Sequence, residues 1–204
     1  VSIPSISENT ETCHEVIEFV KAEIAILGYF THSQPGVSSP WLIATTKDTK
    51  TPDILLAAHL DVVPAPDELF AMRKQDGRLY GRGVYDMKLA AACYIEFLKA
   101  HADKLASLNI GILFTTDEES NSLSMIDVLA TDLRPKVVFL PDGGDNWSVE
   151  KRAKGLYNFR LTATGRSAHG SRPWEGDNAL HSLIDDIQIL RSKYPSDSPS
   201  VPTL

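Results

Sequence analysis

Short apolar runs alternate along the chain, up to about residue 152, with segments in which apolar residues recur every three to four positions. The apolar runs predict strands, most of them buried on both faces, at 41–46, 53–58, 109–116 and 136–142. The segments with helical spacing are 11–27, 86–102 and 123–130. This alternation is typical of an α/β fold in which a largely parallel mixed sheet is sandwiched by helices.

The pattern changes beyond residue 152. Residues 155–165 alternate between polar and apolar types as in a half-exposed antiparallel strand, and residues 178–194 form an amphipathic helical pattern. We therefore predict one domain at 1–152 and the start of an α+β domain at 153–204. The chain begins at Val1 without a signal-peptide pattern and stops in the Ser/Pro-rich stretch "SVPTL", so we expect both ends to be cut.

Composition and net charge exclude some classes of binding partner and indicate a cellular compartment. The formal net charge of -7 argues against nucleic acid and against an anionic membrane surface. No apolar run approaches the roughly 18–20 residues that span a bilayer. The two cysteines, Cys13 and Cys93, form no CxxC pair and suggest no disulfide framework, which favours a reducing compartment and predicts a cytoplasmic protein.

Ionisable side chains follow three of the predicted strands, at the point where each strand ends. They are His59 and Asp61 after the first, Asp117, Glu118 and Glu119 after the second, and Asp142 after the third, with Asp86 following the Gly-rich turn "YGRGVYD". Ligands of open α/β sheets bind beyond the carboxyl ends of the strands. We therefore expect these groups to share one crevice.

Several carboxylates in one crevice repel one another, and their burial is costly without a counter-charge. A divalent metal ion supplies that charge. One imidazole with several carboxylates suits Zn²⁺, or Mn²⁺ and Co²⁺ where oxygen ligands dominate, and several acids can hold two ions as in two-metal hydrolases.

Each motif also has a plainer interpretation. "DEES" is compatible with a helix N-terminus capped by Asp117 or Ser120, "PDGG" with a turn, and Asp86 with the N-cap of the next helix. These interpretations give no reason for all the motifs to follow strands or a Gly-rich turn.

The motifs together resemble a known family. "HLDVVP", "LYGRGVYDMK", "TTDEES", "PDGG" and "GRSAHGSRPWEGDNAL" have the order and approximate spacing of the metallopeptidase family of carboxypeptidase G, aminoacylase, acetylornithine deacetylase and succinyl-diaminopimelate desuccinylase. The resemblance implies a zinc-exopeptidase-like catalytic domain at 1–152, lacking its C-terminal part, and a partial lid and dimerisation domain at 153–204.

The resemblance also implies roles for single residues. His59 and Asp142 resemble ligands of a first metal ion, Glu119 a ligand of a second, Asp86 the bridging carboxylate, Asp61 the acid that orients His59, and Glu118 the general base. The family implies one or two Zn²⁺ ions per subunit. Its further histidine ligand for the second ion lies beyond the end of this chain, so we expect this fragment to bind one ion or none and to be inactive.

His169, in "SAHGSRP", resembles a lid-domain histidine that stabilises the oxyanion in the partner subunit's site of a homodimer, and Asn178, in "GDNAL", a polar residue that assists it. The implied reaction is hydrolysis of an amide bond in a peptide or an N-acyl amino acid, as in a carboxypeptidase, deacetylase or desuccinylase. Two alternatives stay open: an aminopeptidase or dipeptidase with the same metal centre, and a non-catalytic binding or dimerisation fragment.

Overall fold

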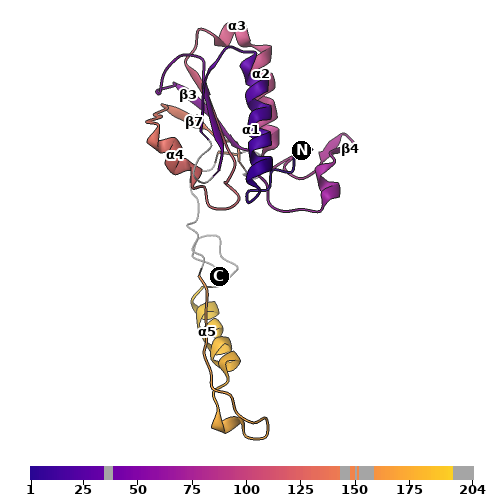
Figure 1. The fold of residues 1–204 in the computed structure, drawn as a ribbon, viewed down its shortest axis with the longest axis vertical. Coiled ribbons are helices and arrows are strands. Elements are labelled where there is room, and N and C mark those ends of the chain that lie inside the picture. Colours follow the sequence, from indigo (N-terminus) through magenta and orange to yellow (C-terminus); the bar gives the residue numbers. More distant parts are fainter. Residues whose placement is uncertain (35–38, 143–147, 150, 152–158, 195–204) are drawn as a thin grey trace. The chain divides into compact units, whose positions relative to one another are not determined.

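The computed structural model describes residues 1–34, 39–142, 148–149, 151 and 159–194 (Figure 1). The chain divides into two compact units, Val1–Ser148 and Val149–Leu204. The glycines of "PDGG" and residues 155–158 of the second predicted unit lie outside the described residues.

A five-stranded sheet forms the centre of the first unit. Its strand order is β1 (Phe30–Gln34), β2 (Trp41–Thr45), β6 (Ile110–Thr115), β3 (Ile54–His59) and β7 (Val137–Phe139). β3 pairs in parallel with β6 and β7, whereas β2 pairs antiparallel with β1 and β6. The predicted α/β fold with a mixed sheet is confirmed, and its parallel pairings belong to β6, β3 and β7.

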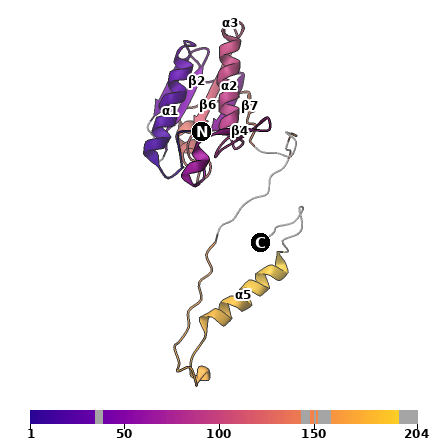
Figure 2. The ribbon, with the colours of Figure 1, turned by 90° about the vertical axis from the view of Figure 1, so that its right-hand side faces the viewer.

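Helices cover both faces of the sheet. α1 (Thr10–Ala25) and α2 (Lys88–Ala100) lie side by side on one face, and α4 (Ser124–Ala130) lies on the other (Figures 1 and 2). Side chains alternate along each strand, so Leu42 of β2 packs in the core beneath α1 and α2, while its neighbour Ile43 packs with Val128 of α4. The short helix α3 (Ala102–Leu105) follows α2.

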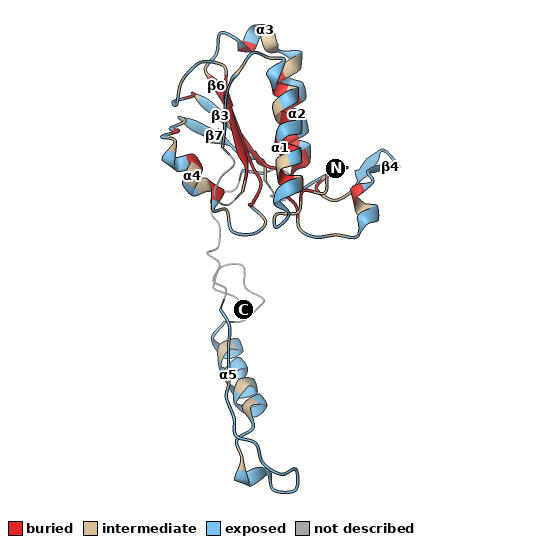
Figure 3. Cartoon of the chain, viewed as in Figure 1, coloured by how far each residue is buried: buried red, intermediate tan, exposed pale blue. Residues whose placement is uncertain are grey.

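The last of the four predicted strands differs from expectation. It was predicted as a buried strand over 136–142, but β7 is shorter, and Val137, Val138 and Phe139 are 57%, 52% and 54% exposed. Among the residues that the structure describes, β7 lies at the edge of the sheet with β3 as its one strand partner, whereas β3 and β6 are flanked on both sides and largely buried (Figure 3). An apolar sequence sets the pattern of a strand, but its neighbours decide its exposure.

A small antiparallel hairpin precedes α2 and was not predicted. It joins β4 (Arg73–Gln75) to β5 (Arg78–Tyr80), after the 3₁₀ helix η1 (Asp67–Phe70). Its two-residue turn, Asp76 and Gly77, has positive φ at both positions, as Asp-Gly hairpin turns require. The hairpin leads directly into the turn that carries Asp86.

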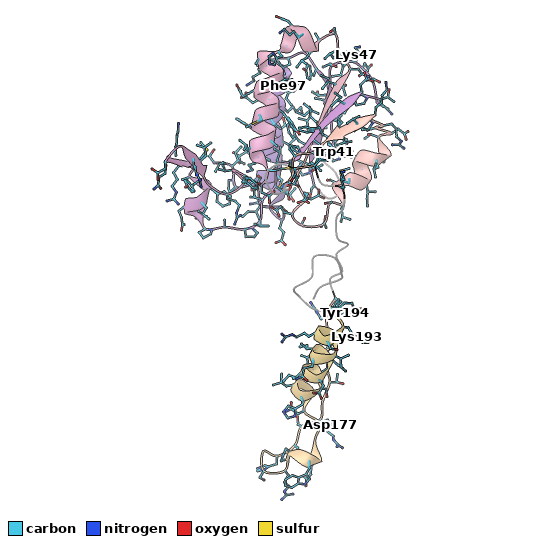
Figure 4. The ribbon with its side chains drawn as sticks, turned by 180° about the vertical axis from the view of Figure 1, so that it is seen from behind. Trp41, Lys47, Phe97, Asp177, Lys193 and Tyr194 are labelled. Atoms are coloured by element: carbon cyan, nitrogen blue, oxygen red, sulfur yellow. The ribbon has the colours of Figure 1, made fainter. Side chains whose placement is uncertain are left out.

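The second unit holds the 3₁₀ helix η3 (Pro173–Glu175) and the helix α5 (Ala179–Lys193), which runs from just beyond Asp177 to Lys193 (Figure 4). α5 lies close to its predicted position. The predicted strand is not formed over 159–165, the described part of its range; one antiparallel bridge joins Arg166 to Asp177. Among the helices in the described part of the chain, none is long and apolar enough to cross a membrane.

Candidate metal centre

His59, the last residue of β3, lies at the middle of a cluster of carboxylates. Its side chain is 2% exposed, and its Nε2 atom lies 3.0 Å from Oδ1 of Asp86. The same nitrogen lies 3.8 Å from Oε2 of Glu118 and 3.8 Å from Oδ2 of Asp142. Three segments that are distant in sequence therefore bring carboxylates to one imidazole.

The topology of the sheet explains this convergence. β3 is paired in parallel with β6 on one side and with β7 on the other, so all three strands end at the same edge. Glu118 follows β6 and Asp142 follows β7, while Asp86 enters from the turn before α2. The peptide bond between Asp86 and Met87 is cis.

Asp61 lies on the opposite side of the imidazole from the other carboxylates. It is fully buried, and its Oδ1 atom lies 3.3 Å from Nδ1 of His59. It also accepts hydrogen bonds from the backbone N–H groups of Glu118, at 3.2 Å, and Glu119, at 3.0 Å. One buried carboxylate thus contacts the imidazole and the segment that carries the two glutamates.

Asp117 is not part of the cluster. It is 1% exposed and accepts hydrogen bonds from the backbone N–H and the hydroxyl of Ser124, at 2.8 and 2.5 Å. Ser124 is the first residue of α4, so Asp117 acts as a helix-terminal acceptor, while Glu118 and Glu119 each belong to a set of side chains that could hold a cation. The N-cap position of α4 is Leu123, so neither Asp117 nor Ser120 is its N-cap residue, although Asp117 accepts from the first residue of the helix.

Asp86 is not a helix cap. Met87 occupies the N-cap position of α2, and no side chain caps the helix there. The alternative interpretation of Asp86 as an N-cap is wrong, and its carboxylate is free to face His59.

Two sets of side chains have the geometry of a cation site. One is His59, Glu118 and Asp142; the other is His59, Asp86 and Glu119, and within each set the ligand atoms lie within 4.8 Å of one another. His59 belongs to both. The second set contains the predicted pair Asp86 and Glu119, whereas the first places Glu118 where the sequence interpretation expected Asp86.

The electrostatics of the cluster favour a cation. Burial, followed by the negative charge of Asp142, raises the pKa of Glu118. Burial and the carboxylate of Asp86 raise the pKa values of Glu119 and Asp142. An ion among these groups would relieve their mutual repulsion, so the donor set fits Zn²⁺, with nitrogen from His59 and oxygen from the acids.

Two further pKa shifts come from the contact between His59 and Asp61. Burial disfavours the imidazolium, but the Asp61 hydrogen bond and the charges of Asp61, Asp142 and Glu118 outweigh it and raise the pKa of His59 to about 9. Burial acts in the opposite direction on Asp61, where hydrogen bonds from His59, Ser7 and Glu119 lower the pKa. Asp61 is therefore ionised and keeps His59 basic, as a metal-binding imidazole requires.

An apolar cavity of about 440 Å³ adjoins the centre. Its lining includes Ala57 of β3, Leu113 of β6 and Val128 of α4, and it extends to His59, Glu118 and Asp142. This apolar wall accounts for part of the burial that raises the pKa values of the two acids.

Sequence interpretation missed two residues beside this centre. The hydroxyl of Ser7 donates a 2.6 Å hydrogen bond to Asp61, and Nζ of Lys88 donates a 2.8 Å hydrogen bond to the carbonyl oxygen of Ile3. Lys88 is only 9% exposed, which is unusual for lysine. Nothing in the local pattern of "SIPSIS" distinguishes Ser7 from an ordinary loop serine.

The second unit carries the two remaining predicted site residues. His169 is exposed, and its Nδ1 atom lies 2.8 Å from the hydroxyl of Ser171. The side chain of Asn178 caps α5 by accepting a hydrogen bond from the backbone N–H of Leu180 at 3.0 Å. Within its own unit Asn178 therefore has a structural role as a helix cap.

Comparison with known proteins places these residues in context. A family model described as peptidase family M20/M25/M40 matches residues 55–192. A succinyl-diaminopimelate desuccinylase of Rickettsia prowazekii is 32% identical over 219 residues, covering 93% of the chain and 55% of that protein. A probable carboxypeptidase of Aspergillus flavus is 27% identical over 208 residues, covering 93% of the chain and 49% of that protein.

Solved structures share the fold. A tripeptidase from Staphylococcus aureus has a TM-score of 0.61 at 19% identity, over 85% of the chain and 50% of that structure. Human carnosine dipeptidase 1 has a TM-score of 0.59 at 20% identity, over 70% of the chain and 36% of that structure. The chain spans about half the length of the curated relatives that it matches.

Proposed function

The chain belongs to peptidase family M20/M25/M40, and on this basis we propose that the protein is a metal-dependent hydrolase of amide bonds. Its substrate is a peptide or an N-acyl amino acid. The observation that carries the proposal is the pair of cation-binding sets that share His59 at the carboxyl end of β3. Relatives whose names describe a desuccinylase and a carboxypeptidase support the same class of reaction.

We assign the metal ligands to His59, Asp86, Glu119 and Asp142, with Asp86 shared between two ions where both are present. Zn²⁺ is the ion that this donor set suits best, and Co²⁺ or Mn²⁺ are the expected substitutes. When bound, such an ion lowers the pKa of a water molecule and polarises the scissile carbonyl.

Glu118 is assigned as the general base. Its side chain is 50% exposed, so it is accessible to a substrate and to water, and its raised pKa brings it closer to the working range of a proton carrier. Glu118 takes a proton from the attacking water and returns it to the leaving amine. The backbone N–H of Glu118 donates a hydrogen bond to Asp61, and this bond fixes the backbone position from which the Glu118 side chain extends.

Asp61 is assigned as the residue that orients His59. Its contact with Nδ1 leaves Nε2 directed at the carboxylates, which is the nitrogen that a metal ion between them would use. Because Asp61 is ionised and fully buried, it also stabilises the positive charge that the centre gains on binding an ion.

His169 is assigned to the oxyanion of the tetrahedral intermediate, supplied from the partner subunit of a homodimer, with Asn178 assisting it. Its exposure within its own unit supports a role outside that unit. The Ser171 hydroxyl beside Nδ1 leaves Nε2 as the nitrogen that donates to the oxyanion. We place the protein in the cytoplasm, in keeping with its two free cysteines, Cys13 and Cys93.

Because the chain spans about half the length of its curated relatives, the proposal is tested on the full-length protein, by assaying its Zn²⁺-loaded form against N-acetyl and N-succinyl amino acids and against dipeptides. We expect turnover that chelator removes and Zn²⁺ restores. Dipeptides with a blocked amine distinguish an acyl-directed enzyme or carboxypeptidase, which accepts them, from an aminopeptidase, which does not. Binding of Zn²⁺ without turnover of any substrate would favour a non-catalytic binding module, and failure to bind Zn²⁺ would refute the proposal.

A further inference from the structure

The segment Ser5–Ser7 runs alongside the residues that follow β3. The backbone N–H of Val62 donates to the carbonyl oxygen of Ser5 at 2.9 Å, and the N–H of Ser7 donates to the carbonyl oxygen of Val62 at 3.4 Å. A parallel bridge joins Ile6 to Val62. The N-terminal segment is thus paired with the stretch that contains Asp61.

Four groups that can donate a hydrogen bond surround the buried carboxylate of Asp61, although Nδ1 of His59 lies nearer to the backbone carbonyl oxygen of Asp61, at 3.1 Å, than to its Oδ1 atom, at 3.3 Å. Its Oδ1 atom faces Nδ1 of His59 and the N–H of Glu118, and its Oδ2 atom accepts from the N–H of Glu119 and the hydroxyl of Ser7. Three of these donors belong to residues of the metal centre. The fourth, Ser7, comes from the N-terminal segment and makes the shortest contact, at 2.6 Å.

We propose that Ser7 is a positioning residue of the metal centre, an inference that rests on the function proposed above. Its hydroxyl fixes the rotation of the Asp61 carboxylate, so that one oxygen stays opposite His59 while both stay bonded to the backbone of the two glutamates. Ser7 thereby sets the relative placement of the imidazole and the segment 118–119.

The physical reason is the number of hydrogen-bond donors that face each carboxylate oxygen of Asp61. Without the Ser7 hydroxyl, Oδ2 keeps one hydrogen-bond donor, the backbone N–H of Glu119, and the carboxylate group of Asp61 can rotate about its Cβ–Cγ bond. A buried carboxylate that loses a donor also loses stabilisation of its charge. This rotation would lengthen the distance from Oδ1 of Asp61 to Nδ1 of His59 and break the hydrogen bond that Oδ1 accepts from the backbone N–H of Glu118.

The N-terminal segment is held independently of Ser7. Nζ of Lys88, just inside α2, donates to the carbonyl oxygen of Ile3, and the hydroxyl of Ser5 donates to the carbonyl oxygen of Leu60 at 2.6 Å. Ser7→Ala should therefore leave the segment in place and remove one contact. Ser5→Ala is the matched control, since it removes an equally short hydrogen bond, from the same segment, that does not reach Asp61.

Three variants of the whole protein test the inference: Ser7→Ala, Ser7→Thr, which keeps a hydroxyl, and Ser5→Ala. In the metal-free protein, Ser7→Ala should move the amide NMR signals of Glu118 and Glu119, whereas Ser5→Ala should not. Titration with Co²⁺ should show an affinity about 10–100-fold lower for Ser7→Ala, the loss typical when a residue that supports a metal ligand is removed. kcat should fall by a similar factor with KM little changed, and Ser7→Thr should restore both.

Unchanged amide signals, or an unchanged Co²⁺ affinity, in Ser7→Ala would overturn the inference, because a water molecule would then replace the hydroxyl without consequence. An equal loss of affinity in Ser5→Ala would also overturn it, since the effect would be general to the segment. Failure of the wild-type protein to bind Co²⁺ refutes the proposed function instead, and the amide signals of the metal-free protein still decide whether Ser7 orders the segment 118–119.

Discussion

Nε2 of His59 lies 3.0 Å from Oδ1 of Asp86, although 27 positions separate the two residues in the sequence. The imidazole is almost fully buried, whereas the side chain of Asp86 is 56% exposed. The centre therefore has a fixed, buried nitrogen on the sheet side and an accessible carboxylate facing solvent. An ion and a substrate can approach from the side of Asp86 without opening the core.

Replacement of His59 by Ala should abolish tight metal binding, because His59 belongs to both cation-binding sets. We expect the loss of affinity to exceed the roughly 10–100-fold typical of residues that only support a ligand. Isothermal titration with Zn²⁺ measures it. His32→Ala, on the edge strand β1, is the control and should bind normally; retained affinity in His59→Ala would exclude His59 as a ligand.

Glu118→Gln should keep the metal and lose turnover. The amide has nearly the shape of the carboxylate but cannot carry the proton, so kcat should fall by about 10²–10⁴-fold. Metal content and kcat measured on the same preparation separate the two effects. Glu68→Gln makes the same chemical change at an exposed position of η1 and should leave kcat unchanged, while normal turnover in Glu118→Gln would remove Glu118 from the mechanism.

The metal-free protein should lose stability as the pH rises from about 6.5 to about 9. The pKa of His59 is raised from 6.5 to about 9, so the folded state holds this proton more tightly than the unfolded state. The resulting stabilisation is complete below pH 6.5 and is lost as the pH rises through 9; its size is on the order of 3 kcal/mol. The raised pKa values of Glu118, Glu119 and Asp142 also make the folded state less stable as the pH rises, but over a lower pH range.

Urea unfolding in the presence of chelator, repeated across this pH range, measures the effect. His59→Gln has no imidazole proton to lose there, so its free energy of unfolding should not decline over the same interval; burial lowers the pKa of Lys88 to about 8, so the stability of the variant should instead rise above that pH. An equal slope in the two proteins would assign the pH dependence to another group.

The sequence predicted that carboxylates gather around His59, as the structure shows, because its signals are local. Apolar runs that end in His59, Glu118 and Asp142 indicate both the strands and the edge at which they end, and parallel pairing then brings these residues together. The supporting contacts are not local. Ser7 and Asp61 are 54 positions apart, and no spacing rule relates them.

The exposure of β7 was unpredictable for a different reason. Its residues are as apolar as those of β3, but β3 has a strand on each side and β7 has one strand partner within the described chain. Likewise, the role of Asp117 in "DEES" differs from that of Glu118 beside it, because consecutive side chains face different parts of the structure. Their residue types alone do not separate a helix cap from a site residue.

Asp117→Asn should destabilise the first unit and disturb the centre indirectly. The buried carboxylate accepts both the N–H and the hydroxyl of Ser124, and an amide would direct its NH₂ group at one of these donors. We expect a loss of about 1.5–3 kcal/mol in the free energy of unfolding, as for hydrogen bonds to charged groups. Asp48→Asn, at an exposed position, should have little effect, and a similarly small change in Asp117→Asn would show that the cap is dispensable.

The assignment of His169 predicts activity from a mixture of two inactive proteins. If His169 acts in the partner subunit's site, a heterodimer of Glu118→Gln and His169→Ala contains one site with both groups intact. Random exchange of subunits in an equal mixture should then restore about a quarter of the wild-type activity, since half of the dimers are mixed and each has one competent site.

The experiment separates action of His169 in the partner subunit's site from action in the site of its own chain. If His169 serves the site of its own chain, every site in the mixture lacks one group, and activity should stay at the level of the single variants. His181→Ala, on the exposed surface of α5, is the matched control and should be active alone. A sedimentation measurement on the mixture must show dimers, because a monomeric protein with full activity would contradict a role for His169 in trans.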